Sequence, residues 1–147
     1  MSPKSLGVVI AFAALAVDQV TKWLAIHNAV WLSGGVPIFP GFNLVLLQNY
    51  GVSFGMFQGV PWWILVGLTA AIVAVLTLWL LRAGNVFEAT GLGLIIGGAL
   101  GNIGDRIRLG AVTDFLDFYI GSMHWPAFNM ADTFIVCGAI LMLWSSK

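Results

Sequence analysis

Hydrophobic residues gather into four long segments along the chain, with polar, glycine-rich or proline-containing stretches between them. The segments cover about residues 6–26, 61–81, 89–104 and 126–144. A helix needs about 20 mostly apolar residues to cross the hydrocarbon core of a bilayer. Backbone that faces lipid must also satisfy its own hydrogen bonds, which a helix does within its own segment. The pattern therefore predicts four membrane-spanning helices in a single membrane-embedded domain that covers residues 1–147.

The third apolar segment contains six glycines, at positions 91, 93, 97, 98, 101 and 104. Small residues let helices approach each other closely in lipid. Such a face suits packing within one chain as well as packing between two chains. We expect a monomer.

The first and third spans are followed by long connecting segments, residues 27–60 and 105–125. Prolines and glycines interrupt any continuous helix in the first of them. Residues 42–48 and 112–120 have the composition of strands, so we expect them to pair into a small sheet at the membrane surface. Residues 53–58 are expected to form a short interfacial helix. The predicted class is an all-α integral membrane protein with four transmembrane helices, a small extracytoplasmic β-sheet and a short interfacial helix.

The distribution of Lys and Arg outside the spans predicts the orientation. Lys4, Arg82 and Lys147 lie on one side of the membrane, whereas residues 27–60 contain no Lys or Arg. Two arginines follow the third span, so the two sides differ little in their number of positive charges. The prediction of orientation therefore depends on the absence of Lys and Arg from the first connecting segment. We therefore expect both termini in the cytoplasm and both long connecting segments on the outer face.

The composition supports the membrane assignment and excludes several other classes. Of the 147 residues, 60% are hydrophobic and 8% are charged, which is too little charge for the surface of a soluble domain. The formal net charge is zero and no basic cluster exists, so no nucleic-acid partner is expected. The single cysteine, Cys137, forms no internal disulfide. No spacing of Cys or His suggests a metal site, and we expect no metal and no cofactor.

The amino terminus has the charge and the apolar run of a signal peptide, with Lys4 followed by apolar residues from Leu6 onward. This run continues past Val17, carries Asp18 and Lys22, and has no cleavage pattern of small residues. We interpret it as a retained first span.

Two aspartates stand at the membrane boundary. Asp114 follows the third span and Asp132 opens the fourth, so the predicted topology brings both to the outer face. Ionisable side chains at this depth are costly and usually mark a functional site. Two carboxylates that share a site hold one proton between them, and one acid then activates water while the other polarises a carbonyl, as in aspartic proteases. The alternative, that each carboxylate caps a helix or pairs with an arginine, stays open.

The other charged residues have structural interpretations. Asp18 and Lys22 stand at i and i+4 on the first span and are expected to pair with each other, with the Lys22 amine extending outward. Asp117 falls on the opposite face of its strand from Asp114 and is expected to be solvated. Neither histidine has a partner at a useful spacing, and both are expected at the membrane interface.

Polar residues near the two aspartates carry two interpretations each. Arg106 orients the site rather than acting as a catalyst, because a guanidinium does not release its proton. It either holds Asp105 or anchors a substrate carbonyl. Asn49, Asn102 and Asn129 either cap and turn the backbone or orient the backbone or a substrate.

Five sequence blocks carry a more specific resemblance: residues 18–22, 49–55, 97–106, 110–115 and 128–132. In this order, with four apolar segments between and around them, they resemble the bacterial lipoprotein signal peptidases (signal peptidase II) over essentially the whole chain. Thr113 stands where an aliphatic residue is expected in that pattern.

The resemblance implies a membrane aspartic endopeptidase with Asp114 and Asp132 as its catalytic pair. It implies cleavage of prolipoproteins just before a cysteine that carries a diacylglyceryl group, inhibition by the cyclic peptide globomycin, and no need for a metal. It places the protein in the bacterial cytoplasmic (inner) membrane, in contact with lipid, with the active site near the outer face. The remaining residues implied to bind substrate or support the site are Asn49, Gly51, Asn102, Asp105, Arg106, Asn129, Ala131, Asp18 and Lys22.

Glycines and large apolar residues alternate within residues 51–59, which suggests a hinged lid over the two aspartates. Two rival classes are less favoured. A magnesium-dependent membrane transferase would gather Asp105, Asp114 and Asp117 around the metal, but the dense aspartate–glycine–arginine signature of phospholipid head-group transferases is absent. A proton-coupled carrier would need acids along a relay through the membrane, and spans two to four carry none at mid-depth.

Overall fold

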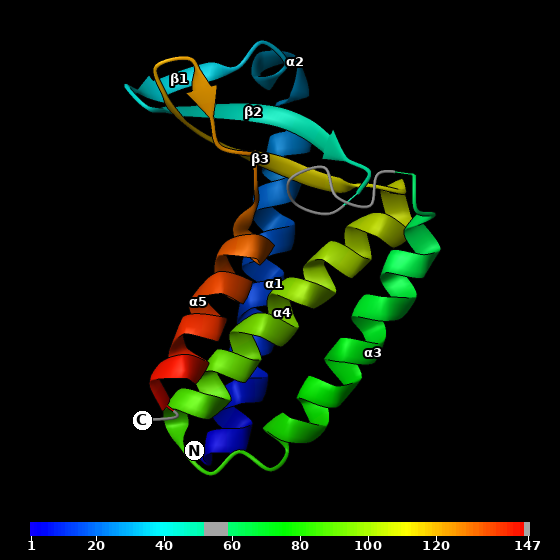
Figure 1. Cartoon of the computed structure of the whole chain (residues 1–147), viewed down its shortest axis with the longest axis vertical. Coiled ribbons are helices and arrows are strands. Elements are labelled where there is room, and N and C mark those ends of the chain that lie inside the picture. The colour runs from blue at the N-terminus through cyan, green and yellow to red at the C-terminus, as the bar shows by residue number, and fades with distance from the viewer. Residues whose placement is uncertain (52–58, 146–147) are drawn as a thin grey trace.

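The computed structural model describes residues 1–51 and 59–145, and it combines a bundle of long helices with a small sheet at one end (Figure 1). The helices are α1 (Pro3–His27), α2 (Ala29–Leu32), α3 (Trp62–Leu80), α4 (Val86–Leu109) and α5 (Met130–Ser145). The strands are β1 (Val36–Phe39), β2 (Phe42–Asn49), β3 (Val112–Ile120) and β4 (Met123–His124). The start of α1 and the end of α5 lie at the end of the bundle away from the sheet.

The central helix of the bundle is α4, which packs against α1, α3 and α5. Several glycines of α4 lie in close contact with the neighbouring helices. A Cβ added at Gly97 would collide with the carbonyl oxygen of Ala11 on α1, and a Cβ at Gly98 would collide with that of Ala131 on α5. The small-residue face predicted for the third span therefore serves packing within the chain.

Among the described residues, three helices are long and apolar enough to cross a membrane, namely α1 with 25 residues, α3 with 19 and α4 with 24. The helix α5 is apolar but shorter, with 16 residues, and is about 24 Å long at 1.5 Å per residue. The long helices therefore match the four predicted spans in position, and three of them have full crossing length.

The sheet is antiparallel throughout, with strand order β1-β2-β3-β4. The strands predicted at residues 42–48 and 112–120 are confirmed and form the central pair, β2 and β3. The sequence does not predict β1 and β4. β4 has only two residues, and β1 contains Pro37, which an edge strand tolerates. Because the sheet has four strands in the described part of the chain, the protein is helical with a sheet rather than all-α.

The predicted end of the third span is wrong. The helix α4 continues to Leu109, so Asp105 and Arg106 lie on the helix rather than in a connecting segment. Charged residues lower the hydropathy of this last turn, but they do not interrupt a helix when their side chains find partners. The helix ends at Gly110, whose φ of 71° is left-handed, a conformation that glycine adopts without strain.

The predicted start of the fourth span is also too early. The helix α5 begins at Met130, and the residues before it run beside β3, where Phe128 bridges to Leu116. The short helix predicted at residues 53–58 lies outside the described residues. A different short helix, α2, precedes the sheet, and its buried Leu32 belongs to the same apolar cluster as Phe115 of β3.

Candidate active site

Asp114 lies on β3, where the sheet meets the bundle, and is 3% exposed. Leu47 of β2 is its partner across the sheet, so Asn49 stands diagonally opposite on the same face. The Asn49 Nδ2 atom donates to Asp114 Oδ2 at 3.1 Å. The strand register therefore explains why two residues that are 65 positions apart meet.

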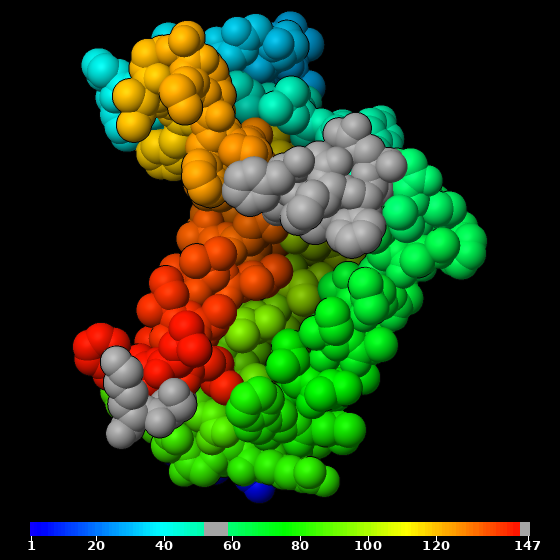
Figure 2. Space-filling view, viewed as in Figure 1, coloured from blue at the N-terminus to red at the C-terminus, as the bar shows by residue number. Residues whose placement is uncertain are grey.

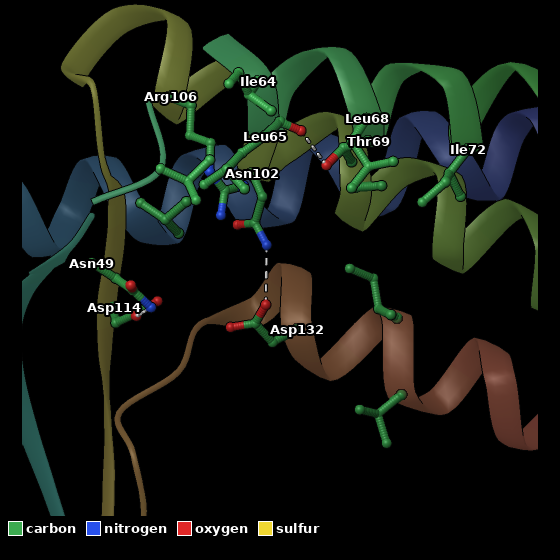
Figure 3. A pocket seen from close by; sticks show the side chains of 15 residues that line it. Asn49, Ile64, Leu65, Leu68, Thr69, Ile72, Asn102, Arg106, Asp114 and Asp132 are labelled. Carbon is green, nitrogen blue, oxygen red and sulfur yellow. Dashed lines mark hydrogen bonds between the residues drawn. The ribbon is translucent and has the colours of Figure 1, made fainter. Parts of the chain in front are cut away.

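Asp132 lies in the first turn of α5. Its backbone N–H donates to Asn129 Oδ1 at 3.0 Å, and its Oδ2 accepts from the Asn129 backbone N–H at 3.3 Å. This reciprocal pair is a capping box, which satisfies backbone donors that the first turn leaves free. Asp132 Oδ1 accepts a hydrogen bond from Asn102 Nδ2 of α4 at 3.0 Å (Figure 3). The carboxylate is therefore oriented from two sides.

Asn129 connects the two aspartates directly. Besides its bonds to Asp132, its Nδ2 donates to Asp114 Oδ1 at 2.7 Å, and the residue is fully buried. The capping alternative raised by the sequence thus holds for Asp132. The alternative of an arginine partner does not, because neither carboxylate forms an ion pair within residues 1–51 and 59–145. We call Asp114 and Asp132 the aspartate pair.

The environment of Asp114 favours its protonated form. Burial and, to a lesser extent, the negative charge of Asp132 raise its pKa to about 7. The hydrogen bonds from Asn49 and Asn129 oppose this rise, because they stabilise the ionised form. Two buried carboxyls in this arrangement titrate as a unit, and the aspartate pair holds one proton near neutral pH.

A cavity of about 720 Å³ opens beside the aspartate pair. This volume is in the range of ordinary ligand sites. In the space-filling view, part of α4 remains visible between α3 and α5 (Figure 2), and these three helices supply most of the apolar wall. The polar end is formed by Asn49, Asn102, Arg106, Asp114 and Asp132, and the apolar wall by Val60, Ile64, Leu65, Leu68, Thr69, Ile72, Ala99, Val112, Ile135 and Val136.

Lys22 is buried behind the cavity and does not extend outward as predicted, because three acceptors inside the protein surround its ammonium group. The Nζ atom lies 2.8 Å from Asn102 Oδ1, 2.9 Å from Asp18 Oδ2 and 3.1 Å from Asp105 Oδ2, and the residue is 1% exposed. The predicted pairing of Asp18 with Lys22 is confirmed. These residues form a buried ionic cluster between α1 and α4.

Asp18 and Ala131 meet across the bundle. Asp18 Oδ1 accepts from the Ala131 backbone N–H at 2.9 Å, and both residues are fully buried. A carboxylate near the first turn of a helix also interacts favourably with the positive end of the helix dipole. The contact therefore fixes the start of α5, one residue before Asp132.

Arg106 does not hold Asp105, so that interpretation is wrong. Asp105 instead pairs with Lys22 and with Arg108 and accepts from the Thr113 backbone N–H at 3.0 Å. Arg106 Nη2 donates to the carbonyl oxygen of Gly51 at 3.0 Å. This bond connects Gly51 to Arg106, which lines the polar end of the cavity.

The prediction of a solvated Asp117 is wrong, and His124 has a partner that its sequence spacing does not suggest. Asp117 points away from Asp114, as its strand parity requires, but it is 7% exposed rather than solvated. Its carboxylate accepts from Asn43 Nδ2 at 2.9 Å and lies 2.8 Å from His124 Nδ1. Sequence spacing does not show these partners because the hairpin to β4 and the register with β2 bring them together.

Sequence reasoning missed two parts of the site. Thr113 is fully buried, and its backbone carbonyl accepts from Asn129 Nδ2 at 3.3 Å. The α3 side of the cavity, with Ile64, Leu65, Leu68 and Ile72, follows a helical spacing. The span is apolar on every side, so the residues that face the cavity do not differ in polarity from those that face away. The sequence therefore gives no signal that identifies this face.

The three aspartates of the rival magnesium site do not converge. Asp105 belongs to the buried ionic cluster, Asp114 faces the cavity, and Asp117 is bound on the other face of β3. Each carboxylate is held by a different set of partners, and this separation does not favour a shared metal site.

Comparison with known proteins gives consistent matches. A protein-family model described as Signal peptidase (SPase) II matches residues 10–147. A lipoprotein signal peptidase of Beijerinckia indica is 44% identical, with 97% of this chain and 88% of the relative covered. One of Anaplasma phagocytophilum is 38% identical, with 97% and 92% covered.

Two solved structures described as bacterial membrane enzymes superpose with TM-scores of 0.84 and 0.81. Each is 29% identical over 95% of this chain, and the match covers 85% and 90% of the solved chains. Together with the apolar helices, this likeness shows a multi-span membrane protein with a small antiparallel sheet.

Proposed function

The chain belongs to the signal peptidase II family and so acts in removing signal peptides from prolipoproteins, and we propose that it does so as an aspartic endopeptidase. Asp114 and Asp132 are the proposed catalytic residues. The observation that carries the proposal is their convergence at one end of the cavity, bridged by the buried amide of Asn129. The proposed active domain comprises residues 1–147.

In the proposed reaction, ionised Asp132 takes a proton from water as the water oxygen attacks the carbonyl carbon of the scissile amide. Asp114 gives its proton to the carbonyl oxygen, which produces a tetrahedral gem-diol. Asp132 then gives its proton to the amide nitrogen, the C–N bond breaks, and Asp114 takes back a proton from the diol. The products are a carboxylic acid and an amine, and the aspartate pair again holds one proton.

The surrounding polar groups support this division of roles. Asn49 and Asn129 donate to Asp114, and Asn102 donates to Asp132. Arg106 adds a buried positive charge to the cavity wall, with its Gly51 contact fixing the guanidinium. We assign Asp18, Lys22, Asp105 and Ala131 a supporting role outside the cavity. Lys22 donates to Asn102, Asp18 and Asp105 pair with Lys22, and the Ala131 backbone N–H donates to Asp18.

The substrate proposed for this site is a prolipoprotein whose cysteine already carries a diacylglyceryl group, cut just before that cysteine. The apolar part of the cavity runs along α3 from Ile64 to Ile72, about 12 Å at 1.5 Å per residue. This length of apolar wall suits lipid chains and an apolar signal segment that arrive through the bilayer plane. We expect a globomycin-type cyclic peptide to compete for the same cavity.

We further propose four membrane crossings, with α5 as the fourth, in the bacterial cytoplasmic (inner) membrane. Both termini then lie in the cytoplasm, and the sheet and the aspartate pair lie at the outer face. Asp132 lies in the first turn of α5, at the end of the bundle that carries the sheet (Figure 1), which supports this placement of the aspartate pair. The proposed enzyme is a monomer in contact with lipid. The lid suggested for residues 51–59 falls mostly outside the described residues and stays a prediction.

The test is a gel assay with protein purified in detergent and a diacylglyceryl-modified precursor peptide. We expect Asp114→Asn and Asp132→Asn each to lower the cleavage rate by at least about 1,000-fold. Asp117→Asn is the matched control, because it changes a buried carboxylate on the same strand outside the cavity. Activity that persists in both site variants, or wild-type protein that fails to cut the lipidated precursor, would count against the proposal. Loss of activity with a chelator would favour the magnesium alternative.

A further inference from the structure

We infer that Lys22 is a positioning residue for this reaction, which acts through Asn102 to hold Asp132 ready to accept a proton from water. The inference rests on the proposed function of the aspartate pair. Lys22 does not line the cavity, so it has no contact with a substrate there. Its hydrogen-bonded connection to Asp132 passes through one side chain, the amide of Asn102.

The orientation of that amide follows from the chemistry of the ammonium group. Lys22 Nζ only donates hydrogen bonds, so the atom of Asn102 that lies 2.8 Å from it must be the oxygen. Asn129 Nδ2 donates to the same oxygen at 3.3 Å. Asn102 Nδ2 is therefore forced toward Asp132 Oδ1, at 3.0 Å. Without the cation, a rotated amide would present its oxygen to Asp132, and two acceptors would face each other.

The charges of the neighbouring elements balance only when Lys22 is present. The carboxylates of Asp18 and Asp105 are matched by Lys22 and by Arg108, whose side chain is 58% exposed. The charge of Arg106, from α4, then matches an aspartate pair that carries one negative charge. The remaining ionisable groups near the strand, Asp117 and His124, pair with each other on its other face.

Removing the Lys22 cation alone would leave one buried negative charge in excess. Buried charges without partners are costly, so ionisation of the aspartate pair would become less favourable. The positive charge of Lys22 also lowers the pKa of Asp114. A purely structural role for Lys22, as a counterion for Asp18 and Asp105, predicts lower stability and no change in how the aspartate pair titrates. The two interpretations therefore differ in a measurable pH profile.

The first test variant is Asp18→Asn/Lys22→Met. It removes both members of a buried ion pair, so no carboxylate of that pair is left unmatched, and the amide introduced at position 18 keeps an oxygen that accepts from the Ala131 N–H. We expect kcat to fall about 10- to 100-fold, as it does when outer partners of catalytic groups are removed, while KM stays within about threefold. The decline of activity above neutral pH should move to higher pH, because Asp114 loses a cation that lowers its pKa. The simultaneous loss of the Asp18 carboxylate, which pairs with that cation, makes this shift smaller than removal of Lys22 alone would.

The second variant, Asp18→Asn/Lys22→Gln, keeps a side-chain donor for Asn102 and removes only the charge. It should keep more of the wild-type kcat than the first variant and show the same shift of the pH profile. This variant also serves if the methionine variant does not fold. Arg108→Gln is the matched control, since it removes a solvent-exposed cation that pairs with Asp105 and does not contact Asn102. Water screens a charge at this position, so the pH profile of this variant should match the wild type.

The outcomes separate the two proposals. An unchanged pH profile in both Lys22 variants, with any loss of rate explained by lower stability, would overturn the positioning role. If Asp114→Asn and Asp132→Asn remain inactive in the same assay, the proposed function stands despite that result. If either aspartate variant cuts the precursor at the wild-type rate, the proposed function fails first, and the Lys22 inference fails with it.

Discussion

Asn129 serves both carboxylates of the aspartate pair with one side chain. Its oxygen accepts from the Asp132 backbone and its nitrogen donates to Asp114, so the amide cannot rotate without losing both bonds. Asp132 is oriented by the capping box that it forms with Asn129 at the start of α5. The same Asn129 side chain also orients Asp114. A local helix-capping motif thus sets the relative geometry of two groups on different elements.

We expect Asn129→Ala to lower kcat by at least about 100-fold, because one amide donor to Asp114 and the cap of α5 are lost together. Asn43→Ala is the matched control: it also removes an amide donor to a buried aspartate on β3, but at Asp117, outside the cavity. Single-turnover cleavage of the lipidated precursor measures both. Equal losses in the two variants would show that Asn129 acts through general stability of the sheet.

The pKa of Asp114, raised to about 7, predicts a pH–rate profile. Above this pH the free enzyme loses the shared proton, so kcat/KM should fall about tenfold per pH unit. Asn49→Ala removes a hydrogen bond that lowers this pKa, so its profile should decline at higher pH than that of the wild type. A decline at the wild-type pH in Asn49→Ala would mean that another group controls this limb.

The same shift makes a prediction about stability. A carboxyl whose pKa is raised on folding costs increasing free energy as the pH rises from about 4, the usual pKa of aspartate, to about 7. Asp114→Asn removes this cost. Its melting temperature in detergent should exceed that of the wild type by several degrees at pH 8, and the difference should shrink toward pH 5. A constant difference across this range would contradict the raised pKa.

At the scale of the elements, the spacing of residues predicts local structure well and cross-element partners poorly. The two central strands and the positions of the long helices follow from composition and hydropathy. The i and i+4 pairing of Asp18 with Lys22 is likewise local and correct. Lys22 reaches further, to Asp105 and Asn102 on α4, and no pattern within the first span indicates that contact.

The helix boundaries at the site show the same limit. Hydropathy ends the third span before Asp105, whereas the helix continues because Asp105 finds Lys22, Arg108 and the Thr113 N–H. Partners that come from other elements decide whether a charged turn stays helical. The main elements of the fold and the convergence of the two aspartates could therefore be predicted from the sequence motifs and their order along the chain. The contacts that support the aspartates could not be predicted, because they depend on the packing of α1 against α4.

The close packing of α4 against α5 should control the position of Asp132. A methyl group at Gly98 would collide with the carbonyl of Ala131, the residue before Asp132. We expect Gly98→Ala to lower kcat by at least about tenfold, because a displacement near 1 Å is costly for a catalytic group. Gly67→Ala on α3 meets no neighbour and should keep wild-type kcat. Equal kcat values in the two variants would show that this helix contact does not position Asp132.

At the scale of the whole molecule, the sheet and the bundle both contribute polar groups to the site. The sheet contributes Asn49 and Asp114, and the bundle contributes Asn102, Arg106 and Asp132 (Figure 3). The cavity continues from this polar end along α3, between helices that cross the membrane. A chain with this arrangement offers water and polar groups at one end of the substrate site and an apolar wall at the other.

The apolar wall should therefore govern substrate binding rather than chemistry. Ala99 is 5% exposed and lines the cavity, so Ala99→Phe would place a ring in the space proposed for the substrate. We expect KM for the lipidated precursor to rise at least about tenfold, with the pH–rate profile unchanged because Asp114 keeps its partners. Leu100→Phe, the next residue on α4 and outside the cavity lining, should keep the wild-type KM. An unchanged KM in Ala99→Phe would place the substrate elsewhere, and the cavity would then lose its role.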